Sequence, residues 1–165
     1  MADKMMSERL QPSLLDRLTD DDPTNPREGR EARVIDIRRL RDIIQRDLGW
    51  LLNTTNNDGW IDATRTPLTA KSVLNYGVHD VAGDFAAKDK ALTIRKSIIA
   101  CIETYEPRIR KGSIQVDMRS ADASRTTVIN FDIRADMWAE PIPIELYLRS
   151  TIDVTTGQLS LERSG

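Results

Sequence analysis

The spacing of apolar and polar positions divides the chain into a helical first half and a strand-rich second half. The longest helical pattern runs over residues 33–52, where apolar side chains recur every three or four residues. One stripe of this helix contains Ile37, Leu40, Ile44, Leu48 and Leu51. A second apolar group, on roughly the opposite side, contains Ile35, Ile43 and Trp50. Two apolar faces predict burial between two layers, or one face for the core and one for a partner.

Two further helices are predicted before the strands begin. In residues 66–77, Thr66 can cap the first turn, Pro67 suits the first helical position and Gly77 suits the exit. A third helix is expected over 88–104. Its broad apolar face contains Leu92, Ile94, Ile98, Ile99, Cys101, Ile102 and Tyr105.

Beyond residue 113 the pattern changes to the strict alternation of half-buried strands. The alternating positions are Ile114, Val116 and Met118, then residues 128–135, then Ile142 to Val154, and, after a Thr-Thr-Gly turn, Leu159 and Leu161. Helices followed by hairpin-linked strands predict an α+β domain. We expect its N-terminal helices to pack on one face of a small, mainly antiparallel sheet from the C-terminal half.

The first 32 residues predict an arm and a linker. Ser13 can cap a short helix near 13–18, whose apolar side chains are Leu14, Leu15 and Leu18. Residues 19–32 are acidic, contain Pro and Gly, and have almost no apolar side chains, which is typical of a linker. We therefore expect residues 33–165 to form a single α+β domain. The arm either docks on that domain or serves as a peptide for a partner.

Composition narrows the class of protein. The chain has 165 residues, of which 39% are hydrophobic and 30% charged, as in a globular protein with a real core. The net charge of −2 offers no basic field for nucleic acid or an anionic membrane. A single cysteine excludes an internal disulfide and favours a reducing compartment. No apolar run approaches the ~18 residues that span a bilayer, and no signal peptide is visible, so we expect a cytoplasmic protein without direct membrane insertion.

Candidate chemistry is sparse. One histidine and one cysteine cannot supply the usual zinc ligands, and no phosphate-binding glycine loop or nucleophile elbow is present, so no metal or cofactor is expected. His79 stands beside Asp80, but no nucleophile motif accompanies the pair, which favours a loop histidine. Cys101 lies on an apolar stripe and is interpreted as a core residue. The low aromatic content, 5%, does not support a sugar cleft around the many carboxylates.

Glu106 stands at the helix end where a negative charge is least favourable. Because Pro107 disfavours helical geometry at the residue before it, the third helix should end at or just before Glu106. An exposed carboxylate there is unfavourable by up to ~1 kcal/mol. Two interpretations remain open. Either Glu106 points into water, or a cation such as Arg108 holds it while Pro107 fixes the direction in which the first strand leaves.

Three motifs carry a resemblance to a known family. The stretches RDLGWLLNT (46–54), SVLNYGVHD (72–80) and YEPRI (105–109), in that order, resemble the baseplate wedge family of contractile injection machines. LLDRL (14–18), ahead of an acidic linker, is similar to the type VI secretion branch of that family, the TssE subunits.

The resemblance implies a small α+β fold in a sixfold cytoplasmic baseplate that docks on a membrane and helps to start polymerisation of the contractile sheath. It implies contractile sheath subunits and other baseplate wedge subunits as partners, with docking by exchanged strands. The family's Glu-Pro-Arg motif maps onto Glu106, Pro107 and Arg108. We therefore expect a non-enzymatic structural subunit. The alternatives are a peptidoglycan hydrolase, or a regulatory adaptor that binds a signalling protein.

Three hypotheses follow for individual side chains. Glu106 makes a charge-assisted bond that holds the helix-to-strand corner, and this corner presents the sheet edge to the sheath. The leucines of the arm helix dock on another wedge subunit. Arg46 and Trp50, with Ile35 and Ile43, form a second face that is either buried or turned toward a partner, since arginine and aromatic side chains are common interface anchors.

Overall fold

The computed structural model describes residues 13–20, 23–24, 36–80, 87–119, 128–137, 144–153 and 155–163. The chain divides into two compact units, Met1–Ile44 and Gln45–Gly165. The predicted arm-and-linker boundary after residue 32 stays a prediction. Ile35, Ile142 and Val154, which were assigned to a helix and a strand, lie outside the described residues.

The first unit contains the predicted arm helix. Helix α2 spans Leu14–Leu18, and the Ser13 side chain caps it by accepting a hydrogen bond from the Asp16 N–H. None of its residues is buried, and all three leucines are exposed. The short helix of the sequence analysis is thus confirmed, with its apolar side chains facing solvent.

Helix α3 spans Ile37–Leu52 and crosses the division between the units. Its first turn is stabilised by Asp36, whose carboxylate accepts a hydrogen bond of 2.7 Å from the Arg39 N–H. The apolar stripe expected from the sequence is buried at Leu40, Ile44, Leu48 and Leu51.

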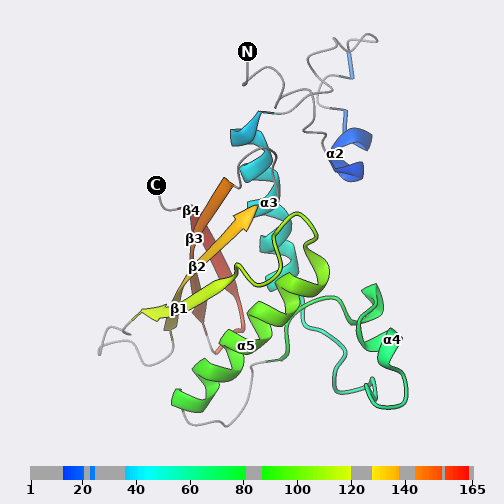
Figure 1. Ribbon diagram of the computed structural model, residues 1–165, viewed down its shortest axis with the longest axis vertical. Helices are drawn as coiled ribbons and strands as arrows, with labels where there is room; N and C mark the ends of the chain where they lie inside the picture. The colour runs from blue at the N-terminus through cyan, green and yellow to red at the C-terminus, as the bar shows by residue number, and fades with distance from the viewer. Residues whose placement is uncertain are drawn as a thin grey trace. The chain divides into compact units, whose positions relative to one another are not determined.

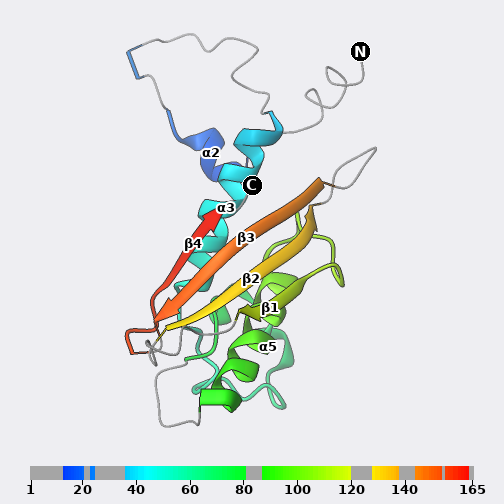
Figure 2. The same ribbon diagram turned by 90° about the vertical axis from the view of Figure 1, so that its left-hand side faces the viewer.

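The second unit is built on a four-stranded sheet (Figures 1 and 2). The strands are β1 (Gln115–Arg119), β2 (Val128–Met137), β3 (Ile144–Asp153) and β4 (Leu159–Arg163), and they pair in that order. All three pairings are antiparallel. Strands of consecutive number lie side by side, as expected for hairpin-linked strands.

One face of this sheet is covered by helices. Helix α5 (Ala87–Tyr105) and the C-terminal half of α3 lie on the same face, behind the sheet in Figure 2. Alternate side chains of β2 and β3 are buried, and they include Phe131, Ile133, Met137, Leu146 and Leu148. The α+β class, the antiparallel sheet and the one-sided helical layer are therefore confirmed.

The predicted helix over 66–77 is wrong as a single element. The structure has helix α4 (Pro67–Ala70) followed by a 3₁₀ turn, η2 (Val73–Asn75). Between them Ser72 is extended, and its side chain accepts a hydrogen bond from the Leu74 N–H. Serine competes in this way with helical backbone bonding, so the chain restarts as a new turn.

Two expected core positions are exposed. Ala91 is buried, and Leu92 is the next residue of α5. One residue turns a helix by about 100°, so Leu92 lies off the buried face. Met118 in β1 is also exposed. Among the described helices, none has the length and apolar character needed to cross a membrane.

Candidate functional site

The candidate site is the corner between α5 and β1. Helix α5 ends at Tyr105, and the Glu106 N–H still donates to the Ile102 carbonyl at 2.9 Å. The Ile109 N–H then donates to the Glu106 carbonyl at 3.2 Å, which closes a turn around Pro107. Ile109 is buried and bridges to Met137 of β2. The chain therefore leaves the helix through a closed turn and enters the sheet layer directly.

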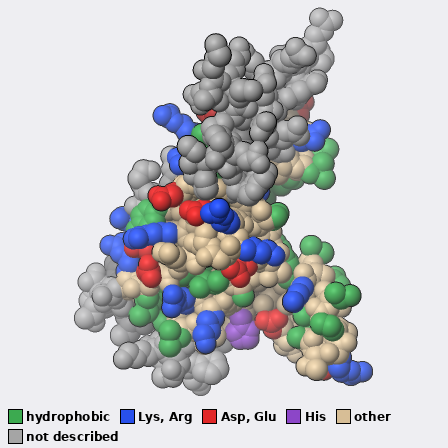
Figure 3. Space-filling view, viewed as in Figure 1, with side chains coloured by type: hydrophobic (Ala, Val, Ile, Leu, Met, Phe, Trp, Pro, Cys, Tyr) green, Lys and Arg blue, Asp and Glu red, His purple; other side chains and the backbone are tan. Residues whose placement is uncertain are grey.

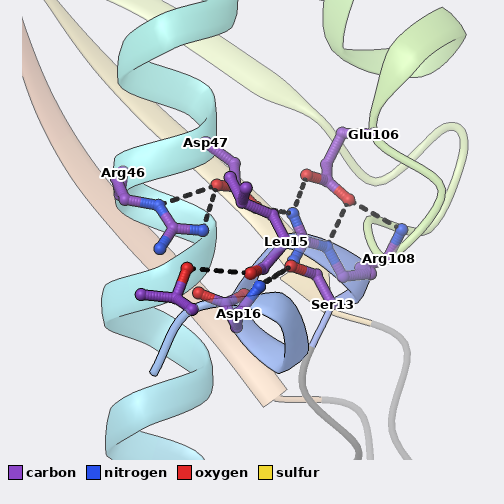
Figure 4. Close-up of polar contacts among 8 residues, drawn as sticks. Ser13, Leu15, Asp16, Arg46, Asp47, Glu106 and Arg108 are labelled. Atoms are coloured by element: carbon purple, nitrogen blue, oxygen red, sulfur yellow. Dashed lines mark hydrogen bonds and ion pairs between the residues drawn. The ribbon is translucent and has the colours of Figure 1, made fainter. Parts of the chain in front are cut away.

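The Glu106 carboxylate is buried in this turn, with 5% of the residue exposed. Its Oε1 accepts hydrogen bonds from the Arg108 backbone N–H at 3.0 Å and from Arg108 Nε at 2.7 Å. Its Oε2 accepts from Arg108 Nη2 at 2.5 Å (Figure 4). A bidentate arginine–carboxylate pair is among the strongest neutralising contacts available to a buried charge. Glu106 is thus held by a cation, the second of the two interpretations left open by the sequence.

Arg108 also reaches across to helix α3. Its Nη2 donates to Asp47 Oδ2 at 2.7 Å, so one guanidinium joins the end of α5 to α3 (Figure 4). Burial by itself would lower the pKa of Arg108, because it penalises the charged form. Hydrogen bonds and charges from Glu106 and Asp47 outweigh that effect and raise the pKa. The guanidinium is therefore a permanent charge between two carboxylates.

Arg46 and Trp50 extend this cluster along α3. Arg46 Nε and Nη2 donate to Asp47 Oδ1 at 3.0 and 2.7 Å. The Arg46 guanidinium carbon lies 4.8 Å from the centre of the Trp50 ring, within the range of a cation–π contact. Trp50 is exposed, whereas Ile43 is buried. The proposed second face thus contains buried Ile43, half-buried Arg46 and exposed Trp50, and its role toward a partner stays a prediction.

The four charged groups of the corner cancel. Glu106 and Asp47 carry two negative charges, and Arg108 and Arg46 carry two positive ones. Each carboxylate is bound by a guanidinium. The geometry suits fixing a chain direction, because the charged side chains are bonded to one another.

Asp47 is the member of the corner that the sequence analysis missed. The sequence contained a usable signal, because Asp47 lies three residues after Ile44 and four before Leu51, at the border of the stripe predicted to be buried. A carboxylate that borders a buried stripe needs a cation or hydrogen-bond donors nearby.

The two outer edges of the sheet differ in how their backbone groups are bonded. On β4, the Leu159 N–H and carbonyl are bonded by the side-chain amide of Asn53, each at 2.8 Å. The Leu161 carbonyl accepts from Gln45 Nε2 at 3.2 Å. Gln45 of α3 and Asn53, the residue after α3, therefore bond three outward backbone groups of β4, as a further strand would.

The β1 edge is less covered. The outward carbonyl of Val116 accepts a hydrogen bond of 2.7 Å from Arg95 Nε of α5. Because backbone groups alternate in direction along an edge strand, the N–H and carbonyl of Met118 also point outward. No residue within the described ranges bonds either group of Met118. This end of β1 is thus the more open edge of the sheet.

The remaining chemical candidates lie beside a surface cavity of about 370 Å³ between α5 and residues 56–79. His79 Nδ1 lies 3.6 Å from Asp58, and both side chains are about half exposed. Cys101 is buried and donates to the Gly77 carbonyl at 3.0 Å, and burial raises the pKa of its thiol to about 12. The thiol therefore stays protonated, as expected of a core residue. Within the described ranges, no group of three or more His, Cys, Asp or Glu residues could hold a metal ion.

Comparison with known protein families gave a match. The family model described as "Baseplate wedge protein gp25" matches residues 38–142, well over half of the chain. This range contains α3 from its second residue onward and the whole Glu106–Arg108 corner. Neither the curated proteins nor the solved structures gave a match.

Proposed function

The chain belongs to the baseplate wedge protein gp25 family, and we propose that it is a non-enzymatic subunit of a type VI secretion baseplate that helps to initiate sheath assembly. Family membership implies contacts with other baseplate subunits. The type VI assignment, and with it a cytoplasmic baseplate docked on a membrane, draws on the likeness of residues 14–18 to that branch. The sheath as a partner belongs to the proposal alone.

The observation that carries the proposal is the buried Glu106–Arg108 pair. Three hydrogen bonds join these two residues, and a fourth joins Arg108 to Asp47 of α3. They fix the path by which the chain passes from α5 into β1. A role in holding β1 at a defined angle explains why a buried carboxylate stands at a helix end where its charge is otherwise unfavourable.

We place the docking of a sheath strand at the β1 edge. An extended partner needs a row of unbonded N–H and carbonyl groups. Asn53 and Gln45 already bond both backbone groups of Leu159 and the carbonyl of Leu161 on β4, whereas the outward groups of Met118 have no partner among the described residues. The β1 edge therefore supports strand addition better than the β4 edge.

A pair of proline substitutions tests this placement. Met118→Pro removes an outward N–H while leaving the bonds between β1 and β2 in place, because proline is tolerated at an edge position. Leu161→Pro is the matched control, since its N–H points outward on the opposite edge. With purified sheath and baseplate subunits, Met118→Pro should lose sheath recruitment and Leu161→Pro should keep it. The melting temperature of each variant checks that it is folded.

Glu106→Ala tests the corner in the same assay. It should weaken sheath recruitment although Met118 and the rest of β1 are unchanged. If Glu106→Ala and Met118→Pro both recruit the sheath normally, the proposal for the corner and the edge is wrong. Turnover of purified peptidoglycan by the chain, abolished by one carboxylate substitution, would contradict the non-enzymatic role.

The arm helix is proposed to dock on another wedge subunit. Leu14, Leu15 and Leu18 are all exposed on α2, so the helix buries no apolar side chain of its own. Deletion of residues 1–20 should weaken binding to the other wedge subunits and leave the melting temperature of the chain nearly unchanged. A large drop in melting temperature would instead show that the arm is part of the fold.

A further inference from the structure

A second surface, separate from the corner and the β1 edge, has the features of a protein contact. It is the loop region between α3 and α5, residues 56–76, which contains α4 and η2 and is named here the 56–76 lobe. Four of its large apolar side chains are exposed, Trp60 by 91%, Leu68 by 86%, Val73 by 80% and Leu74 by 65%. Figure 3 shows hydrophobic side chains gathered over the α4 region.

The lobe is held together by polar contacts in place of an apolar core. Asn75 is buried, and its side chain donates to Asp58 at 2.8 Å and to the Ala70 carbonyl at 2.9 Å. The same side chain accepts from the Asn57 N–H at 2.9 Å. One amide therefore ties together three parts of the loop.

The lobe is also fixed at its base and to α5. The chain enters and leaves through a parallel bridge between Thr55 and Val78. Gly77 makes this closure possible, because its φ is +121° and a side chain there would overlap the Thr54 carbonyl. The Tyr105 hydroxyl of α5 lies 2.7 Å from the Asn75 carbonyl. The exposed apolar side chains thus stand on a pre-organised frame, which lowers the entropic cost of binding.

Charge in the lobe is arranged unevenly. The Asp58 carboxylate bonds the side chains of Asn75 and Asn56, and Asp62 accepts from the backbone N–H groups of Thr64 and Arg65. Both carboxylates therefore accept hydrogen bonds from groups within the lobe. Its cations, Arg65 and Lys71, make no ion pair with a described residue. An incoming surface would meet apolar side chains together with two cations that have no ion pair among the described residues.

We propose that the 56–76 lobe docks into an apolar groove with an acidic rim on another protein subunit. Trp60 and Leu68 insert into the groove, and Arg65 and Lys71 pair with its carboxylates. Exposed tryptophan and arginine are the side chains that most often dominate interface energies. A lipid surface fits less well, because the lobe carries as many carboxylates as cations and so gains little attraction to anionic lipid. The proposal does not depend on strand addition at β1.

The test compares the double variant Trp60→Ser/Leu68→Ser with Leu92→Ser in the full chain. Leu92 is 55% exposed on α5, outside the lobe, and serves as the matched control. Binding is measured against the purified baseplate subunits of the same machine. The double variant should bind at least tenfold more weakly, and Leu92→Ser should bind as the original chain does. Near-ultraviolet circular dichroism checks that both variants keep their tertiary packing.

A photo-crosslinking side chain at position 60 identifies the contact. The expected product joins it to a peptide of another baseplate subunit in which apolar residues are flanked by Asp or Glu. Arg65→Glu with Lys71→Glu should also weaken this binding, and the loss should shrink as salt rises. Unchanged binding of the double variant, a crosslink to a second copy of the chain, or binding of the lobe to phosphatidylcholine–phosphatidylserine vesicles would each overturn the proposal. Sheath recruitment should survive the lobe substitutions, which separates this test from that of the β1 edge.

Discussion

Replacing Glu106 tests the energetics of the corner most directly. Glu106→Gln removes the charge and keeps the shape, so one carbonyl oxygen can still accept from the Arg108 N–H. Glu106→Ala removes every acceptor. A hydrogen bond to a charged group contributes about 1.5–3 kcal/mol, and breaking a fully buried ion pair costs about 3–5 kcal/mol. The side chain of Arg108 is 29% exposed and keeps Asp47, so the loss should fall below that upper range.

The free energy of unfolding should therefore drop by about 1–2 kcal/mol for Glu106→Gln and about 2–3 kcal/mol for Glu106→Ala. Double-mutant cycles with Arg108→Gln isolate the pair itself. The coupling should be largest, about 2 kcal/mol, between Glu106 and Arg108. It should be about 1 kcal/mol between Asp47 and Arg108, and below about 0.5 kcal/mol between the more exposed Arg46 and Asp47. This order follows the increasing exposure of the carboxylates and of the guanidinium groups.

Urea unfolding monitored by circular dichroism measures these values, provided that the m-value is the same in all variants. Repeating the cycles in 1 M NaCl adds a second check, because salt should reduce the Arg46–Asp47 coupling by the largest fraction. A Glu106–Arg108 coupling below about 0.5 kcal/mol, or a reversed order of the three couplings, would refute the view that the buried pair holds the corner.

Three other substitutions have defined outcomes. Gly77→Ala should lower the free energy of unfolding by about 2 kcal/mol or more, because φ is +121° there and the new methyl group overlaps the Thr54 carbonyl. Gly112→Ala, also at positive φ but in open space, should cost less. Thermal unfolding compares the two variants. Asn53→Ala should lower the free energy of unfolding by about 2 kcal/mol, because both Leu159 backbone groups lose their bonds. Light scattering should also show more self-association through the β4 edge. Wild-type stability together with wild-type light scattering would contradict the edge assignment. The raised pKa of Cys101 means that the folded state binds the thiol proton more tightly than the unfolded state does. The stability that the protonated thiol contributes is therefore present below pH 9 and is lost as the pH rises from 9 toward 12. Stability should fall by on the order of 1 kcal/mol more between pH 8 and 10 than it does in Cys101→Ala, and an identical fall in both proteins would show that the thiol does not contribute.

Much of the fold could be predicted from local pattern. The alternation at 128–135 and 144–153 follows from a sheet with one buried face, and the order of the strands follows from short hairpin connections. The 66–77 region was misjudged for a physical reason. Its end signals are real, but Asn75 forms its bonds with residues up to 18 positions earlier, and such contacts leave no periodic trace in the sequence.

Only part of the corner site could be predicted from the sequence. Glu106 and Arg108 could be paired from their positions around a proline at a helix end. Asp47 lies 61 residues away from Arg108, so only the packing of α3 against the end of α5 brings the two together. The bonding of β4 by Gln45 and Asn53 was equally hidden, since it spans more than 100 residues of sequence.

The closure of one sheet edge by Asn53 has a consequence for assembly. A sheet with two open edges is divalent: once a strand joins one side, the other side can accept a further copy, and chains of domains grow without limit. A sheet with one edge closed to further strands is monovalent toward extended partners. A monovalent unit can begin a row or end one, and it cannot become a link in the middle. By bonding outward groups of β4, Asn53 and Gln45 favour strand addition at β1 over β4, and with it a single direction of assembly.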